Sequence, residues 1–201
     1  MIATQSRAKR QIGRADILPL DDYARTRSQS RREIGDLKKR RRVEVGPFAT
    51  FAFENFATMW SQVHEMLYIE KGGDEQLADE LAAYNPLVPK GRELVATVML
   101  EVEDAERRGR VLATLGGIER SAFLRFAGET IAGVPEADQE RTDETGKASA
   151  VQFLHFPFTD AQVAKFRAPG AEITLGFKHA NYAQLTVLPE AVRAALAADF
   201  A

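Results

Sequence analysis

The spacing of apolar residues changes along the chain near residue 86. Before that point, apolar side chains recur every three or four positions, which predicts helices beginning near Asp21, residue 54 and residue 74. After it, runs rich in Val, Leu, Phe and Thr are separated by polar turns, which predicts antiparallel strands. The predicted strands cover residues 93–103, 110–118, 121–134, 149–158 and 171–179.

Two further patterns complete the predicted architecture. Residues 43–53 alternate around Gly46-Pro47, which predicts two short extended pieces or one bent strand. Residues 159–170 predict a short helix, and residues 188–200 predict a C-terminal helix with Pro189 in its first turn. We therefore predict an α+β fold: N-terminal helices packed on a mainly antiparallel sheet, with a short helix and a C-terminal helix.

A chain of 201 residues fits one domain, or one domain with an appended arm. Residues 1–16 are polar, basic and aperiodic, which predicts a disordered leader. Residues 17–201 form the predicted single domain, which is mainly helical over 17–85 and mainly antiparallel strands over 86–201. The polar stretch from residue 135 to 147 predicts a mobile loop.

Charge is divided unevenly along the chain, although the net charge is only −2. Residues 1–42 hold 13 Lys and Arg against 5 Asp and Glu, whereas the remaining residues hold 14 against 24. Arg25, Arg31, Arg32 and Arg40 lie in the most basic part and are candidates for binding an anionic partner. The alternative is that these arginines pair with acids of the same chain or of a second copy.

Several classes of chemistry are excluded by composition. The chain has no cysteine, so it forms no disulfide, thiolate nucleophile, thiolate zinc site or cysteine-held cluster of its own. No apolar run approaches the roughly 18–20 residues that span a bilayer, and the basic start is not followed by the apolar block of a secretory signal. Phosphate-binding loops and a nucleophile elbow are also missing from the sequence. We therefore expect a cytoplasmic protein that does not contact a membrane.

The segment ENFATMWSQVHEML, residues 54–67, raises the question of a metal site because it contains His64 beside Glu65. A helix places its apolar residues on one face and puts Glu54, Thr58, Ser61 and Glu65 on the opposite face. Glu54 and Glu65 would then be about 16 Å apart along the axis, too far to share one ion. Tyr68 stands where a zinc helix would carry its second histidine. We predict a core helix, with no metal and no cofactor.

Polar residues on that helix suggest a different site, a cleft between the helices and the sheet. Glu54, Gln62 and Glu65 would line this cleft together with an arginine. His179 and Tyr182, in the segment KHANYAQL, would supply acid–base groups at a strand end. The alternative for these two residues is a structural one, in which they cap a turn.

Segments from about residue 17 to 200 resemble the bacterial domain-of-unknown-function family numbered 3501. They are ILPLDDYARTR, KKRRRVEVG, FENFATMWSQVHEMLYIE, NPLVPKGRELVATVMLE, KHANY and AALAADF. The most specific piece comprises Phe53, Glu54, Asn55, Thr58, Gln62, Glu65, Met66, Leu67 and Glu70. The chain departs from the family pattern at His64, where glutamine-like residues are usual, and at Ala180, where proline is common.

The resemblance implies no established activity. Members of the family tend to be encoded beside rubrerythrin-like proteins and iron–sulfur oxidoreductases, which implies a role near iron or peroxide redox chemistry. The first hypothesis is therefore a non-catalytic accessory protein that binds such a partner, or itself as a homo-oligomer, through the basic helical region. An enzyme or small-ligand-binding protein with the polar cleft is the second hypothesis. The third is nucleic-acid binding by the basic arm, which lacks interleaved aromatic residues.

Overall fold

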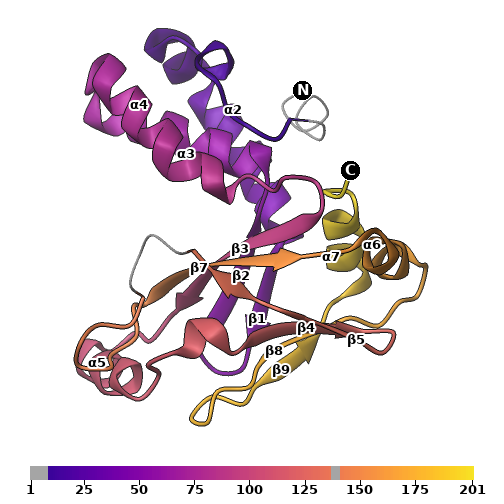
Figure 1. Cartoon of the computed structure of the whole chain (residues 1–201). Helices are drawn as coiled ribbons and strands as arrows, with labels where there is room; N and C mark the ends of the chain where they lie inside the picture. The colour runs from indigo at the N-terminus through magenta and orange to yellow at the C-terminus, as the bar shows by residue number, and fades with distance from the viewer. Residues whose placement is uncertain (1–8, 137–140) are drawn as a thin grey trace.

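The structure of the chain is a computed structural model that describes residues 9–136 and 141–201. Two antiparallel sheets form its lower part in Figure 1. The first sheet has the order β1 (Arg42–Val45), β2 (Ala49–Glu54), β3 (Glu93–Leu100), β7 (Val151–Pro157) and β6 (Val134–Pro135). The second has the order β5 (Glu129–Ala132), β4 (Ala122–Phe126), β8 (Thr174–Phe177) and β9 (Leu185–Val187). Inward-facing side chains of both sheets, including Phe51, Phe156 and Phe177, form one hydrophobic core. The predicted α+β fold with antiparallel strands is confirmed.

The two sheets are joined at both edges. At one edge β5 continues into β6 through Gly133, whose N–H donates to the carbonyl of Ala122 at 2.8 Å. A Cβ at Gly133 would lie 3.1 Å from Ala122 Cβ, so a larger residue at this position would crowd the Ala122 side chain. At the other edge the Tyr182 hydroxyl donates to the carbonyl of Val45 at 2.6 Å and accepts from the Ala49 N–H at 3.1 Å. These contacts close the two sheets around their shared core.

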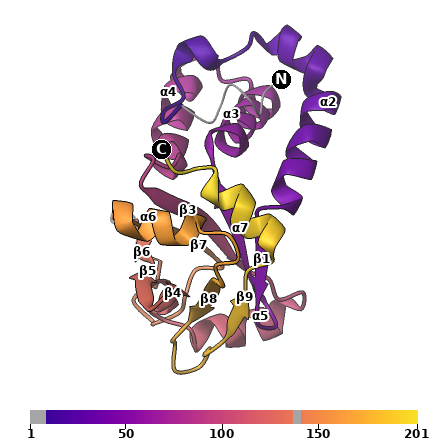
Figure 2. The same cartoon turned by 90° about the vertical axis from the view of Figure 1, so that its right-hand side faces the viewer.

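A layer of helices lies above the two sheets in Figure 2 and meets the first sheet at one end. It consists of α2 (Leu20–Lys39), α3 (Phe56–Glu70) and α4 (Gly73–Tyr84), and α3 packs against both of the others. A second hydrophobic cluster, which includes Trp60, Val63 and Val95, joins α3 to β3. Within the described residues, no helix is both long and apolar enough to cross a membrane.

Three more helices and three 3₁₀ turns complete the described secondary structure. The helices are α5 (Ala105–Ala113), α6 (Asp160–Arg167) and α7 (Glu190–Ala197), of which α6 and α7 pack together. The 3₁₀ turns are η1 (Arg14–Asp16), η2 (Asn85–Leu87) and η3 (Ile118–Arg120).

Helix α3 is more deeply buried than its sequence pattern predicts. The side chain of Asn55 caps its first turn by accepting from the Thr58 N–H at 3.0 Å. Thr58 and Ser61 were predicted to face outward, but they are buried because α2 and α4 cover the flanks of α3. The helix also begins later than predicted: Glu54 is the last residue of β2 and lies outside α3.

The predicted disordered leader over residues 1–16 is wrong for residues 9–16. Ile12 is buried, and the indole N–H of Trp60 donates to the carbonyl of Asp16 at 2.7 Å. The side chain of Asn85 bonds both main-chain groups of Ile12, at 2.7 and 3.0 Å. These partners lie far away in the sequence, so the local polar composition gave no sign of them. Residues 1–8 of the predicted leader, and residues 137–140 of the predicted mobile loop, lie outside the described residues.

Two sequence interpretations in the second half are also wrong. The predicted strand 110–118 begins inside α5, which Asp104 caps by accepting from the Arg107 N–H at 2.7 Å. Gly109 interrupts the helical pattern in the sequence, and the apolar residues after it resemble a strand. The short strand β9 was not predicted because its three residues carry too little periodicity.

Candidate functional site

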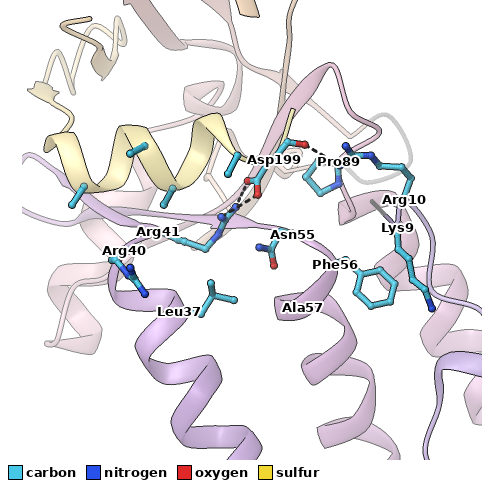
Figure 3. Close-up of a pocket in the computed structure, with 14 residues that line it drawn as sticks. Lys9, Arg10, Leu37, Arg40, Arg41, Asn55, Phe56, Ala57, Pro89 and Asp199 are labelled. Atoms are coloured by element: carbon cyan, nitrogen blue, oxygen red, sulfur yellow. Dashed lines mark hydrogen bonds and ion pairs between the residues drawn. The ribbon is translucent and has the colours of Figure 1, made fainter. Parts of the chain in front are cut away.

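A concave space of about 420 Å³ lies where the end of α2, the start of α3 and one side of α7 meet (Figure 3). We call it the basic groove. Its lining comprises Lys9, Arg10, Leu37, Arg40, Arg41, Asn55, Phe56, Ala57, Pro89, Ala191, Ala194, Ala195, Ala198 and Asp199. The lining therefore contains four basic residues, one acid and a wall of small alanine side chains.

The floor of the basic groove is a buried ion pair between Arg41 and Asp199, which point toward each other in Figure 3. The Arg41 side chain is 2% exposed, and its guanidinium also donates to the carbonyls of Phe53 at 2.8 Å and Glu54 at 3.1 Å. Burial raises the pKa of Asp199, while the positive charge of Arg41 acts in the opposite direction. Four donor contacts hold the guanidinium in place, so Arg41 forms a rigid wall of the groove.

The other three cations are arranged around the mouth of the basic groove. Arg10 donates to the main-chain carbonyl of Asp199 at 2.9 Å, and Lys9 pairs with Asp16. Arg40 follows the last residue of α2, is exposed, and forms no ion pair within the described part of the chain. The positive charges of Arg10 and Arg40 therefore face the groove, and neither pairs with a carboxylate of the described residues.

Of the four arginines predicted to bind a partner, Arg40 is the one that lines this groove. Arg25 pairs with Asp22 on the exposed side of α2, and Arg32 donates to Gln29 at 2.9 Å. Arg31 is also exposed. Helical spacing turns Arg25, Arg31 and Arg32 well over 90° away from the groove residue Leu37. The predicted basic helical region is thus split between a groove and an exposed surface.

Glu65, a predicted cleft residue, lies between α2 and α3. Its carboxylate accepts from Arg27 Nε at 2.9 Å, from Arg27 Nη2 at 2.7 Å and from the Tyr23 hydroxyl at 2.7 Å. The hydrogen bonds from Arg27 lower the pKa of Glu65, and burial raises the pKa of Tyr23. These contacts attach α2 to α3, so Glu65 is engaged inside the helical layer and does not reach a cleft over the sheet.

His179 and Tyr182 flank the turn between β8 and β9, at the opposite end of the molecule from α2 and α3 (Figure 1). His179 Nε2 lies 3.1 Å from the carbonyl of Gly116, and its Nδ1 accepts from the Asn181 N–H at 3.2 Å. Tyr182 is buried against the turn between β1 and β2. The structure therefore does not bring these residues together with Glu65.

Glu54 and Gln62 do come together, in a second cavity of about 420 Å³ that we call the sheet cleft. It lies between α3, the end of α4 and the outer face of the first sheet. Its lining comprises Lys38, Arg41, Arg42, Ala52, Phe53, Glu54, Met59, Gln62, Tyr84, Leu87, Thr97, Met99, Val151 and Phe153. Arg41 lines both cavities and separates them.

His64 is 2% exposed and is held by the helical layer. Its Nδ1 lies 2.8 Å from the carbonyl of Trp60, and its Nε2 lies 3.0 Å from the N–H of Leu18. Within residues 9–136 and 141–201, no three His, Asp or Glu side chains gather as a metal site would require. Both ring nitrogens of His64 are already hydrogen-bonded, so neither is free to bind an ion.

The sequence analysis missed the pair that forms the floor of the basic groove. Arg41 lies in a run of five basic residues, and nothing in that run marks one of them as buried. Asp199 lies 158 positions further along the chain. A single sequence contains no signal that connects two such positions.

Comparison with known proteins identifies the family of the chain and a similar solved structure. A family model described as "Protein of unknown function (DUF3501)" matches residues 11–200. This chain belongs to the DUF3501 family. Its fold is similar to that of a "novel protein of unknown function" from Burkholderia pseudomallei K96243, known from a crystal structure, with a TM-score of 0.88 and 39% sequence identity. That match covers 95% of this DUF3501 chain and 100% of the other chain. No curated protein matches this DUF3501 chain significantly.

Proposed function

We propose that this DUF3501 protein is a non-catalytic accessory protein that binds a carboxylate-bearing segment of a partner protein in the basic groove. The observation that supports this most directly is the imbalance of charge in the lining. Of the four cations in the lining, Arg41 is paired with Asp199 and Lys9 with Asp16, which leaves Arg10 and Arg40 without a carboxylate among the described residues. Arg10 and Arg40 keep positive charge at the mouth, where a carboxylate would supply the missing partner.

The shape of the basic groove suits a protein segment. Three alanines of α7 and Ala198, which follows the helix, form one wall, so an extended backbone can approach the helix closely. Phe56 and Ala57 begin α3 on the opposite wall, where the positive end of the helix dipole adds to the attraction for a carboxylate. Charge sets the rate and specificity of such encounters, and the apolar wall adds buried area.

The chemistry of the lining favours binding over reaction. Asp199 is the one carboxylate of the described lining, and two hydrogen bonds from Arg41 hold it in a fixed position. Catalytic bases need a free lone pair within reach of a substrate proton. A carboxylate engaged in this way serves to orient Arg41.

The proposal includes a redox protein as the partner and a cytoplasmic location, both of which rest on the sequence and the family resemblance. Cell fractionation tests the location. The first partners to test by titration are an iron–sulfur oxidoreductase and a rubrerythrin-like protein, the kinds of protein that tend to be encoded beside members of the family. Binding of either protein should be displaced by free hexaglutamate if it occupies the basic groove.

A fluorescent hexaglutamate peptide is a direct probe of the basic groove. We expect it to bind the wild-type protein, with hexaglutamine as the uncharged control, and to bind Arg40→Glu at least about tenfold more weakly, because one attraction becomes a repulsion. Fluorescence anisotropy measures both affinities at physiological salt.

Arg32→Glu is the matched control, since it reverses the same charge on α2, the helix that Arg40 follows, at a position outside the groove. Arg32 lies eight residues from Arg40, about 12 Å along α2, which exceeds the screening length of about 8 Å. The affinity of Arg32→Glu for hexaglutamate should differ from that of the wild type by less than about twofold. Equal losses in both variants, or no binding of hexaglutamate, would count against the proposal. Loss of a dimer in Arg40→Glu would instead identify a second copy as the occupant, and preferential binding of an oligonucleotide would favour the nucleic-acid hypothesis.

A further inference from the structure

One carboxylate, that of Glu54, lines the sheet cleft. Glu54 ends β2, and its side chain points to the outer face of the first sheet, toward Thr97 on the neighbouring strand. The residue is 6% exposed. Its one hydrogen bond from the described residues comes from the Thr97 hydroxyl, 2.8 Å from Oε1. A buried carboxylate is costly unless several donors or a cation compensate its charge.

The cations that line the sheet cleft do not compensate Glu54. Arg41 bonds the main-chain carbonyl of Glu54, and its charge is matched by Asp199. Arg42 Nη2 lies 3.5 Å from the carboxylate of Glu101, a residue that does not line the cleft. Lys38 is exposed on α2, and no ion pair joins it to Glu54 in the described part of the chain. Among residues 9–136 and 141–201, the Glu54 carboxylate therefore lines the cavity without forming an ion pair.

The rest of the lining is mainly apolar and adaptable. Met59 from α3 and Met99 from β3 face the cavity, together with the ring of Phe153. Unbranched methionine side chains fit varied apolar ligands, and their sulfur atoms make favourable contacts with aromatic rings. Gln62 Nε2 and the Tyr84 hydroxyl are 3.4 Å apart, a long hydrogen bond that leaves both groups able to turn toward a ligand.

We propose that the sheet cleft is a binding site for a small molecule with an apolar, preferably aromatic, body and one protonated amine. The amine forms the ion pair that Glu54 lacks, and the body packs between Met59, Met99 and Phe153. A few polar groups in a mainly apolar cavity are the usual composition of small-molecule sites. Lys38 and Arg42 also line the sheet cleft, and only the first ammonium group can be compensated by Glu54, so the site prefers monoamines to diamines.

Phenethylamine is a suitable probe, with 2-phenylethanol and 3-phenylpropionate as matched neutral and anionic analogues. Protein labelled with ¹³C at its methionine methyl groups reports the position of binding, because Met59 and Met99 line the sheet cleft and Met66 does not. We expect phenethylamine to shift the Met59 and Met99 signals with a millimolar or lower Kd. The alcohol should bind at least about tenfold more weakly, and the carboxylate more weakly still.

Glu54→Gln keeps the size and the hydrogen bond to Thr97 but removes the charge, so it should abolish the preference for amine over alcohol. Glu44→Gln is the matched control, an exposed carboxylate on the outer face of the same sheet that does not line the cleft. The amine preference of the wild-type protein can be measured even if Glu54→Gln does not fold. Unshifted Met59 and Met99 signals, or equal affinity for amine and alcohol, would overturn the proposal. Arg40→Glu should leave this binding unchanged, so the two sites are tested separately.

Discussion

His64 shows how burial fixes the state of a single side chain. Its Nε2 accepts from the Leu18 N–H, so the ring proton lies on Nδ1, which donates to the Trp60 carbonyl. Burial lowers the pKa of His64 below its ordinary value of 6.5. The folded protein therefore holds this histidine neutral, in keeping with its structural position between α3 and the segment before α2.

Because the unfolded chain binds a proton at His64 more readily, the stability that this residue contributes is complete above about pH 6.5 and falls as the pH decreases toward the lower folded-state pKa. We expect His64→Gln to lose less unfolding free energy than the wild type between pH 7.5 and pH 5.5. Urea denaturation at both pH values measures the two losses. Carboxylates titrate in both proteins, so the difference between the two losses of unfolding free energy isolates the contribution of His64. Equal losses in the wild type and His64→Gln would contradict the prediction.

The pair of Arg41 and Asp199 makes the next prediction at the residue scale. Asp199→Asn leaves a buried guanidinium without its counter-charge, and we expect the free energy of unfolding to fall by about 3–5 kcal/mol. The double variant Arg41→Met with Asp199→Leu removes both charges and should be more stable than Asp199→Asn alone. Urea denaturation of the set tests this. A double variant as unstable as the sum of its single changes would show that the pair is not coupled.

Among the elements, α2 is attached mainly through its contacts with α3. It buries only Tyr23, Ser30 and Ile34 over its length, and Glu65 supplies the polar attachment from α3. We expect Glu65→Gln to lower stability by about 1–2 kcal/mol, a value reduced by the partial exposure of the pair. Hydrogen exchange should accelerate in α2 but not in β2 and β3. Asp22→Asn, which breaks the exposed pair with Arg25, is the control and should cost less than about 0.5 kcal/mol.

Elements with a strong pattern of their own were predictable from the sequence. Runs rich in Val, Leu, Phe and Thr predicted strands over 93–103 and 149–158, which the structure places at 93–100 and 151–157. A capping box predicted the helix capped by Thr159. Helix α5 was missed because Gly109 interrupts its pattern. The full burial of α3 was missed because a helix pattern reports one apolar face, while burial of Thr58 and Ser61 depends on which helices pack beside it.

At the scale of the whole molecule, the candidate sites depend on contacts between distant segments. The sequence analysis identified Arg40, Glu54 and Gln62, which line cavities. It grouped Arg40 with three arginines outside the groove, and it grouped Glu54 and Gln62 with Glu65 and His179, which lie elsewhere. Spacing along one helix determines which residues share a face, whereas the basic groove combines residues from both ends of the chain. Such a site becomes visible only after the sheets and helices are assembled.

Closure of the two sheets at Tyr182 gives the last prediction. Its hydroxyl donates to Val45 and accepts from the N–H groups of Phe48 and Ala49, at 2.6, 3.3 and 3.1 Å. Tyr182→Phe leaves these main-chain groups without that partner, and we expect the free energy of unfolding to fall by about 2–4 kcal/mol in urea denaturation. Tyr84→Phe loses one 3.4 Å contact and should cost less than about 0.5 kcal/mol.

Binding of hexaglutamate should be the same in Tyr182→Phe as in the wild type at temperatures where both are folded, because the β8–β9 turn does not line the basic groove. A loss of peptide affinity with unchanged stability would mean that Tyr182 acts on the binding site and not on the join between the sheets. A loss of stability with unchanged affinity would show that the two sheets depend on this hydroxyl, while the groove formed by α2, α3 and α7 keeps its geometry without it.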